Sequence, residues 1–242
     1  MENKAPNLIP KAPVEFTSRL SRGEAWAVGI YLPLHLIVLP TLFGFLLLQQ
    51  RIGESSANMG IYLVGFVYML FFTRRFLRRD FDALCDRPWQ IIAEIVGSYG
   101  VMLCCNMMFS LLAGALVAGE NPNNQSVVAL AADNYGPVAA MAIYMAPVVE
   151  ELLFRAGIFG VLRRYNRIAA YVVSVLGFSL YHVLGYALQD PIYWIYVLQY
   201  IPVSYLLCRC YESSNCIWSS IFFHMLVNGI SIKVLSMAQQ LL

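Results

Sequence analysis

Charged residues are scarce in this sequence, and their scarcity already restricts what the protein can be. Only 12% of the 242 residues are charged, while 60% are hydrophobic, and the mean hydropathy is +0.64. A soluble domain carries roughly a quarter charged residues. The composition therefore excludes a soluble globular domain and predicts an integral membrane protein.

Other features are also missing. There is no glycine-rich phosphate loop and no soluble basic face, which argues against binding of nucleotides or nucleic acid. Cys104 and Cys105 lie inside an apolar run, so the six cysteines do not form the pattern of a disulfide framework. No cleavable signal peptide is expected, because the polar first 23 residues are followed by an apolar run too long for a signal-peptide core.

What the sequence does contain is a series of long apolar runs. Each has about the 20 residues that a helix needs to cross a bilayer, and none shows the roughly ten-residue alternation of a barrel strand. The predicted fold is all-α: a polytopic membrane protein with about seven transmembrane helices, to which residues 76–89 could add an eighth, re-entrant or interfacial segment. The expected spans are 25–49, 56–73, 90–118, 137–161, 169–188, 191–208 and 216–238.

Three regions are expected along the chain. Residues 1–24 form a cytoplasmic N-terminal tail, and residues 25–136 hold transmembrane helices without a recognised motif. Residues 137–238 form a helical core that carries the motifs described below. The longest connection is the loop 119–136, and no feature of the sequence indicates an oligomeric state.

The distribution of arginine and lysine indicates how the helices are oriented. Basic residues precede the first span and follow the second, fourth and sixth spans, whereas the loop 119–136 carries no Lys or Arg. Cytoplasmic loops are enriched in these two residue types. A cytoplasmic N-terminus is therefore predicted, with the C-terminus on the opposite side.

Polar side chains occur at similar depths in several spans. At a rise of about 1.5 Å per residue, Glu150, His182, His224 and Asn228 all lie roughly 12–20 Å from the cytoplasmic end of their spans. An ionised group at mid-bilayer costs about 2.5–3.5 kcal/mol, so the matched depth predicts one shared polar site rather than separate helix–helix hydrogen bonds. His35 lies at about the same depth, but a lone histidine between prolines is expected to bind a freed backbone carbonyl instead.

Helical phase separates the two adjacent acids. Glu151 and Arg155 are four residues apart with the acid nearer the N-terminus, the favourable order for an ion pair. Glu150 points about 100° away, so Arg155 is expected to neutralise Glu151 and leave Glu150 free. Pro147 lacks an N–H and is expected to kink the helix just before the acids, where water has to enter.

This set of groups predicts hydrolysis by an activated water. Glu150 and a nearby imidazole can hold and deprotonate a water, while a second imidazole and an amide could donate hydrogen bonds to an oxyanion. Glu150, His182 and His224 could instead bind a catalytic zinc, and the sequence leaves both routes open. A transporter that uses the acids as a proton or cation site is an alternative of a different class.

At these residues the sequence resembles the CAAX proteases and bacteriocin-processing enzymes, also called the CPBP or abortive-infection family. The three motifs of the family, EExxxR, FxxxH and HxxxN, occur here in order, each on a predicted span. They match EELLFR, FSLYH and HMLVN at Glu150, Glu151, Arg155, Phe178, His182, His224 and Asn228. The resemblance covers roughly residues 137–235.

The resemblance implies an intramembrane glutamate- or metallo-type endopeptidase whose site opens toward the cytoplasmic side. Glu150 and His182 would activate the water, and His224 and Asn228 would stabilise the oxyanion. Glu151, Arg155 and Phe178 would have supporting roles.

The implied partners are membrane lipids and a CAAX-type, peptide-pheromone or bacteriocin-type substrate, and the expected location is a bacterial cell membrane. The resemblance leaves open whether a metal takes part; a divalent metal such as zinc, if one is bound, would be held by Glu150, His182 and His224. Because the family also includes immunity proteins, a non-catalytic bacteriocin-immunity protein is a further alternative.

Overall fold

A computed structural model describes residues 15–116 and 121–239 of the protein. The described chain is all-helical, with 88% helix and no strand, which confirms the predicted fold class. Its helices are α1 (Arg22–Pro33), η1 (Leu34–Val38), α2 (Leu39–Leu48), α3 (Glu54–Phe72), α4 (Arg74–Asp86), α5 (Pro88–Leu116), α6 (Pro122–Asp133), α7 (Tyr135–Ala140), η2 (Met141–Met145), α8 (Ala146–Glu151), η3 (Leu152–Phe159), α9 (Gly160–Leu162), α10 (Arg167–Ala187), η4 (Pro191–Tyr196), α11 (Val197–Ser214) and α12 (Ile217–Gln239).

Seven helical stretches of the described chain are long and apolar enough to cross a membrane, as predicted. Several of them join two or more of the helices named above. They are Arg22–Leu48, Glu54–Phe72, Pro88–Ala113, Tyr135–Leu162, Arg167–Ala187, Pro191–Ser214 and Ile217–Val234.

The two longest connections are helical. α4 occupies most of residues 74–89, where the sequence left an eighth segment open. The prediction of a loop over 119–136 is wrong, because α6 fills most of it. The Asn121 side chain caps α6 by accepting a hydrogen bond of 3.0 Å from the backbone N–H of Asn123, and Pro122 follows at the first helical position, where proline is favoured.

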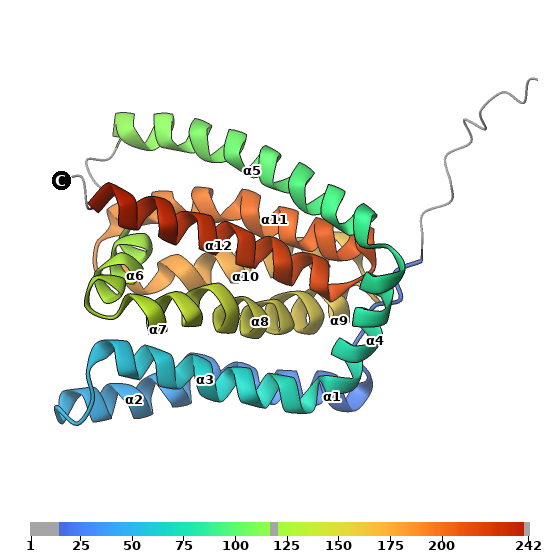
Figure 1. Ribbon diagram of the computed structural model, residues 1–242, viewed down its shortest axis with the longest axis horizontal. Coiled ribbons are helices and arrows are strands. Elements are labelled where there is room, and N and C mark those ends of the chain that lie inside the picture. The colour runs from blue at the N-terminus through green and yellow to red at the C-terminus, as the bar shows by residue number, and fades with distance from the viewer. Residues whose placement is uncertain (1–14, 117–120, 240–242) are drawn as a thin grey trace, which may run out of the picture.

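The spanning helices lie side by side in a bundle whose two ends are easily distinguished (Figure 1). α4 runs across one end, and α6 lies at the opposite end; these are called the α4 end and the α6 end below. The stretch Tyr135–Leu162 is the most deeply buried of the seven. The helices α10, α11 and α12 pack around it, with α1–α3 on one flank and α5 on the other.

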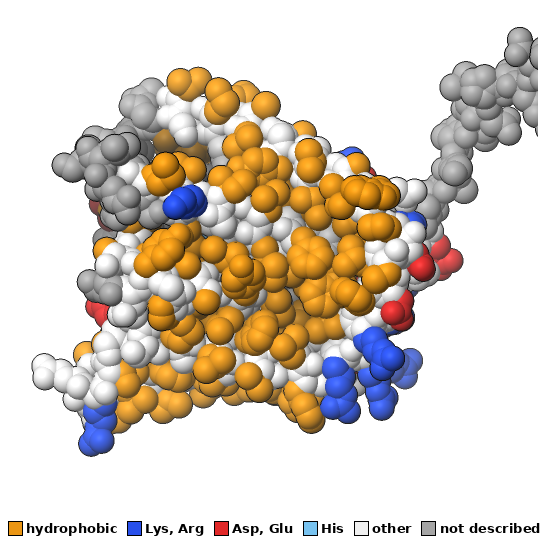
Figure 2. Space-filling view, viewed as in Figure 1, with side chains coloured by type: hydrophobic (Ala, Val, Ile, Leu, Met, Phe, Trp, Pro, Cys, Tyr) orange, Lys and Arg blue, Asp and Glu red, His pale blue; other side chains and the backbone are white. Residues whose placement is uncertain are grey.

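The surface matches this arrangement. Hydrophobic side chains cover the visible flank of the bundle, and Lys and Arg side chains gather at the α4 end (Figure 2). Large apolar side chains that are strongly exposed, such as Leu48, Trp89 and Leu111, lie on spanning helices or at their ends. An apolar flank between two polar ends is the surface that a helix bundle presents in a bilayer.

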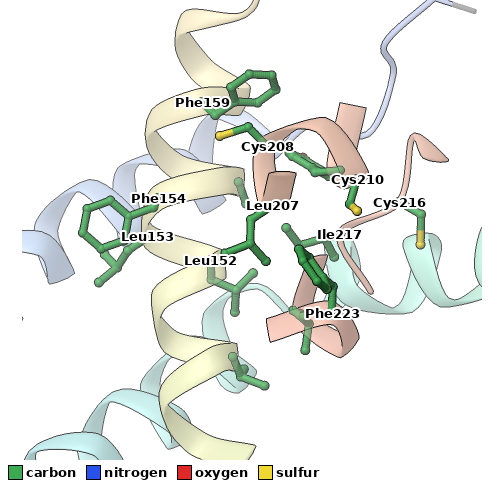
Figure 3. Packing of buried hydrophobic residues seen from close by; sticks show 14 of the residues in the cluster. Leu152, Leu153, Phe154, Phe159, Leu207, Cys208, Cys210, Cys216, Ile217 and Phe223 are labelled. Atoms are coloured by element: carbon green, nitrogen blue, oxygen red, sulfur yellow. The ribbon is translucent and has the colours of Figure 1, made fainter. Parts of the chain in front are cut away.

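Toward the α4 end the interior is filled with apolar side chains (Figure 3). Leu152, Phe159, Leu207 and Ile217 are each 0% exposed. They come from three different spans and belong to one large core cluster. This part of the bundle is therefore closed by packing.

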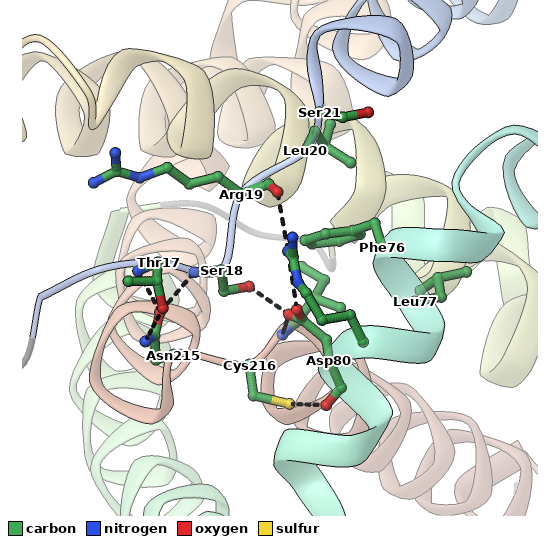
Figure 4. A network of polar contacts seen from close by, with 12 residues as sticks. Thr17, Ser18, Arg19, Leu20, Ser21, Phe76, Leu77, Asp80, Asn215 and Cys216 are labelled. Carbon is green, nitrogen blue, oxygen red and sulfur yellow. Dashed lines mark hydrogen bonds and ion pairs between the residues drawn. The ribbon is translucent and has the colours of Figure 1, made fainter.

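The chain before α1 is fastened to the same end (Figure 4). Ser18 Oγ donates to Asp80 Oδ2 in α4, and the backbone N–H of Ile217 donates to the same oxygen at 2.9 Å. Asn215 Oδ1 accepts hydrogen bonds of 2.8 Å from the backbone N–H groups of Thr17 and Ser18. Residues 1–14 of the predicted tail lie outside the described residues, and the part that follows them is packed against the bundle.

π-Helical segments interrupt two of the spans: η1 lies in Arg22–Leu48, and both η2 and η3 lie in Tyr135–Leu162. In η2 the hydrogen bonds reach one residue further than in an α-helix, so the N–H of Ala146 bonds to the carbonyl of Met141. Pro147 comes directly afterwards, so the expected break at this proline takes the form of a π turn. Glu150 and Glu151 are the last two residues of the short helix α8, and the π segment η3 follows directly.

Candidate functional site

Three predicted side chains from three different spans meet at one point. Glu150 Oε2 lies 3.6 Å from Nε2 of His182 and 3.8 Å from Nε2 of His224. All three line one cavity of ≈ 540 Å³. The matched depth predicted from the sequence corresponds to a real convergence, and the three groups can share a single water.

The two oxygens of Glu150 have different surroundings. Oε1 accepts a hydrogen bond of 2.8 Å from the hydroxyl of Tyr62 in α3. Oε2 is buried and has no hydrogen-bond partner in the protein. A buried carboxylate oxygen without a donor is costly, so Oε2 is the atom at which a hydrogen donor from water or substrate would bind.

Both imidazoles are held through Nδ1. Nδ1 of His182 lies 2.9 Å from the backbone carbonyl of Phe178, which can only accept, so this nitrogen carries the proton. Nδ1 of His224 lies 2.9 Å from Oε1 of Glu151 and donates to it in the same way. In the neutral rings, both Nε2 atoms therefore present lone pairs toward Glu150.

The first motif is held by a buried ion pair. Arg155 Nε lies 3.2 Å from Glu151 Oε2, and both side chains are fully buried. A second guanidinium nitrogen of Arg155 donates to the carbonyl and hydroxyl oxygens of Ser204 at 3.2 and 3.1 Å. The guanidinium also lies 4.3 Å above the ring of Phe178. The supporting roles of Glu151, Arg155 and Phe178 stay predictions, and Ser204 was not predicted.

Asn228 lines the cavity, as its spacing from His224 predicts, but its amide is already engaged. Nδ2 donates a hydrogen bond of 2.8 Å to the backbone carbonyl of Ala142, in the π turn η2. An amide nitrogen carries two hydrogens, so one remains for a ligand. The oxyanion role of Asn228 stays a prediction.

The expectation for His35 is wrong. Both of its ring nitrogens contact tyrosine hydroxyls rather than a freed backbone carbonyl: Nδ1 lies 3.2 Å from Tyr31 and Nε2 lies 2.9 Å from Tyr181. The hydroxyl of Tyr181 lies 2.9 Å from that of Tyr62, which donates to Glu150. His35 lines the cavity. Its ring also belongs to a hydrogen-bonded chain that runs through Tyr181 and Tyr62 and ends at Glu150.

A second group of residues that the sequence did not predict links His182 to the helix α6. Tyr200 of α11 stacks on the ring of His182, with centroids 4.6 Å apart. Its hydroxyl accepts hydrogen bonds from Asn123 at 3.0 Å and from Asn121 at 3.3 Å. The asparagine and proline that begin α6 were visible signals, but nothing in the sequence indicated that this helix lies beside His182.

In the described residues, no group of three or more His, Cys, Asp and Glu side chains is arranged to hold a metal ion. Zinc on Glu150, His182 and His224 stays a prediction.

The comparison with protein families gives a match over the same helices. Residues 133–230 match the family model described as type II CAAX prenyl endopeptidase Rce1-like. This helical core belongs to the Rce1-like family. The comparisons with curated proteins and with solved structures gave no match.

The Rce1-like segment contains every predicted catalytic and supporting residue. It does not contain Tyr62 or His35, which lie on α3 and η1. The cavity is therefore completed by the N-terminal helices, which lie outside the matched segment and for which the sequence gave no motif.

Proposed function

We propose that this protein is an intramembrane endopeptidase of the CAAX-protease type that hydrolyses a membrane-associated peptide or protein. The Rce1-like family is a protease family, and the seven apolar helices make the chain an integral, multi-pass membrane protein. Substrates of the CAAX, peptide-pheromone or bacteriocin type and a bacterial cell membrane are part of the proposal. The observation that carries it is the buried Oε2 of Glu150, which has no donor and faces two imidazole Nε2 atoms.

The proposed reaction begins with a water held by Glu150 and His182. Oε2 of Glu150 and Nε2 of His182 can accept the two hydrogens of one water, whose oxygen lone pair then points away from both acceptors. As the water oxygen bonds to the peptide carbonyl carbon, its proton passes to Glu150. The same proton then goes to the leaving amine as the C–N bond breaks, so Glu150 acts first as base and then as acid.

The oxyanion requires hydrogen donors. The second amide hydrogen of Asn228 is one. Nε2 of His224 is another only when it carries a proton in addition to the one that Nδ1 donates to Glu151. The buried pair of Glu151 and Arg155 keeps this acceptor in place.

Purified variants test the proposal. Glu150→Gln and His182→Ala should each lower cleavage of an S-farnesylated, fluorogenic CAAX-type peptide by about 10²–10⁴-fold, as expected for loss of general acid–base catalysis. Glu94→Gln is a matched control, because Glu94 lies in the spanning helix α5, pairs with Arg209 at 3.4 Å and does not line the cavity. Full activity of Glu150→Gln, with all proteins folded in detergent, would refute the assigned role.

A further inference from the structure

The cavity lies toward one end of the bundle. α3 runs from Glu54 near the α6 end to Phe72 beside α4, and its cavity residues Asn58, Ile61 and Tyr62 are in the first half. α11 runs toward the α4 end, and its cavity residues are Gln199, Tyr200 and Val203, again in the first half of the helix. The residues Asn123 and Asn124 of α6 belong to the lining as well.

Access from the other end is blocked by the structure already described. Between Glu150 and the α4 end lies the fully buried apolar packing of η3, α11 and α12 (Figure 3). Outside that packing, the chain before α1 is bonded to Asp80 of α4 and to Asn215 at the end of α11 (Figure 4). Lining residues with exposed side chains, such as Pro40 and Ser231, lie on the half toward the α6 end.

The basic residues assign the two ends to the two sides of the membrane. Apart from Arg51 and the buried Arg155, the Arg residues of the described chain lie just before or at the start of α1, in or directly after α4, in the turn after α9, at the start of α10 or near the end of α11, all at the α4 end. The α6 end has Arg51 in the turn between α2 and α3 and Lys233 in the last part of α12. The excess of positive charge places the α4 end in the cytoplasm.

We propose that the site is entered from the extracytoplasmic face, and that the substrate is a polypeptide segment presented on that face. This inference rests on the proposed function and names its class of substrate. The sequence led to two expectations, a cytoplasmic N-terminus and a site that opens toward the cytoplasm. In this structure only one of them can hold, because α1 begins at the α4 end and the cavity lies toward the α6 end.

The chemistry of the lining fits a polypeptide. Around the cavity, beyond Glu150 and the histidines, the described polar side chains are mainly amides: Asn58, Asn106, Asn123, Asn124, Gln199 and Asn228. An amide side chain donates and accepts hydrogen bonds, as a peptide backbone does. Glu150 is the only carboxylate, and no Lys or Arg is among the described lining residues. An extended, uncharged stretch of backbone suits such a surface better than an anionic headgroup does.

Cysteine labelling tests the two parts of the geometry without catalysis. Cys85 is exposed on α4 and should react with a membrane-impermeant maleimide in inverted membrane vesicles, but not in right-side-out vesicles. Asn124→Cys, made together with Cys85→Ser, should show the opposite pattern. Cys85→Ser alone measures background labelling. Reaction of the Asn124→Cys variant from the side where Cys85 reacts would overturn the proposal.

Cleavage on each side of the membrane completes the test. The probe is the fluorogenic peptide used above, extended by a charged hydrophilic tag that cannot cross the bilayer. Right-side-out vesicles should cleave it, and inverted vesicles should cleave it only after detergent is added. Cleavage by intact inverted vesicles would overturn the side of entry while leaving the protease assignment intact. Absence of cleavage in detergent would refute the proposed function instead, and the labelling result would still decide the side of entry.

Discussion

The hydroxyl of Tyr62 donates a hydrogen bond of 2.8 Å to Oε1 of Glu150. One partner lies on an N-terminal helix without a motif, and the other lies in the Rce1-like segment. The bond occupies one carboxylate oxygen and leaves the other, Oε2, directed at His182 and His224. The N-terminal helices thus orient the group on which the proposed hydrolysis depends.

Tyr62→Phe should therefore reduce activity without removing any proposed catalytic residue. Loss of a hydrogen bond to a charged group costs about 1.5–3 kcal/mol, which corresponds to roughly a ten- to hundredfold fall in kcat/KM. Tyr193→Phe is a matched control, since Tyr193 packs against Tyr196 away from the cavity lining. Equal activity of the two variants in a peptide-cleavage assay would show that the Tyr62 bond does not orient Glu150 for catalysis.

The ion pair of Glu151 and Arg155 gives a prediction about stability. Arg155→Met leaves a fully buried carboxylate without its cation and should lower the unfolding free energy by about 3–5 kcal/mol. The double variant Glu151→Gln, Arg155→Met removes both charges, and the new amide oxygen can still accept from His224. It should recover much of the lost stability in thermal unfolding in detergent. A double variant less stable than Arg155→Met would contradict this account of the pair.

Asp80 gives a prediction about pH, because it lies in α4 outside the spanning helices. Burial raises the pKa of Asp80 above its ordinary value, although hydrogen bonds from Ser18 and from the N–H of Ile217 oppose the shift. The folded state therefore binds the proton more tightly than the unfolded chain does. The stabilisation from this site is complete below about pH 4 and is lost as the pH rises through the raised pKa.

The measurement compares Asp80→Asn with the unsubstituted protein. Between about pH 4 and 8, the melting temperature of the unsubstituted protein should rise relative to that of Asp80→Asn as the pH falls. Asp82→Asn is the control, because Asp82 is exposed on the same helix. A temperature difference that stays constant with pH, or changes in the other direction, would show that Asp80 does not titrate with a raised pKa.

Metal removal distinguishes the two routes of water activation that the sequence left open, one by Glu150 and an imidazole and the other by a bound zinc. The proposed hydrolysis uses only protein groups and water, so a chelator followed by gel filtration should leave the cleavage rate within about twofold. Metal content measured on the same sample should show less than one zinc per chain. Loss of activity that zinc alone restores would replace the proposed route with a metal-dependent one.

The sequence predicted the central part of the site because its physical basis is local. Helical rise placed Glu150, His182 and His224 at similar depths, and helical phase paired Glu151 with Arg155. The convergence followed because each residue is costly in lipid unless it meets a partner. These arguments need only span ends and residue spacing, which the apolar runs define well.

The contacts of the residues that surround these three groups could not be predicted in the same way. Tyr62, His35 and Tyr200 are ordinary residues of apolar spans, and spacing does not show which helix a side chain faces. His35 was misjudged because its neighbouring prolines suggested a free carbonyl, whereas the tertiary fold supplies tyrosine hydroxyls. The helix α6 was missed because a polar segment was expected to be a loop, although Asn121 and Pro122 together form a helix-start signal.

The π-helical segment η3 makes the site less sensitive to chain length there than in a regular helix. Over Leu152–Phe159 the hydrogen bonds reach one residue further than in an α-helix. Deleting a single residue there would let the segment relax into regular α-helical hydrogen bonding, with little rotation of Glu150 relative to Phe159. The same deletion in the regular helix α10, between Arg167 and His182, would rotate the residues after it by about 100° and carry His182 out of the sector that faces Glu150.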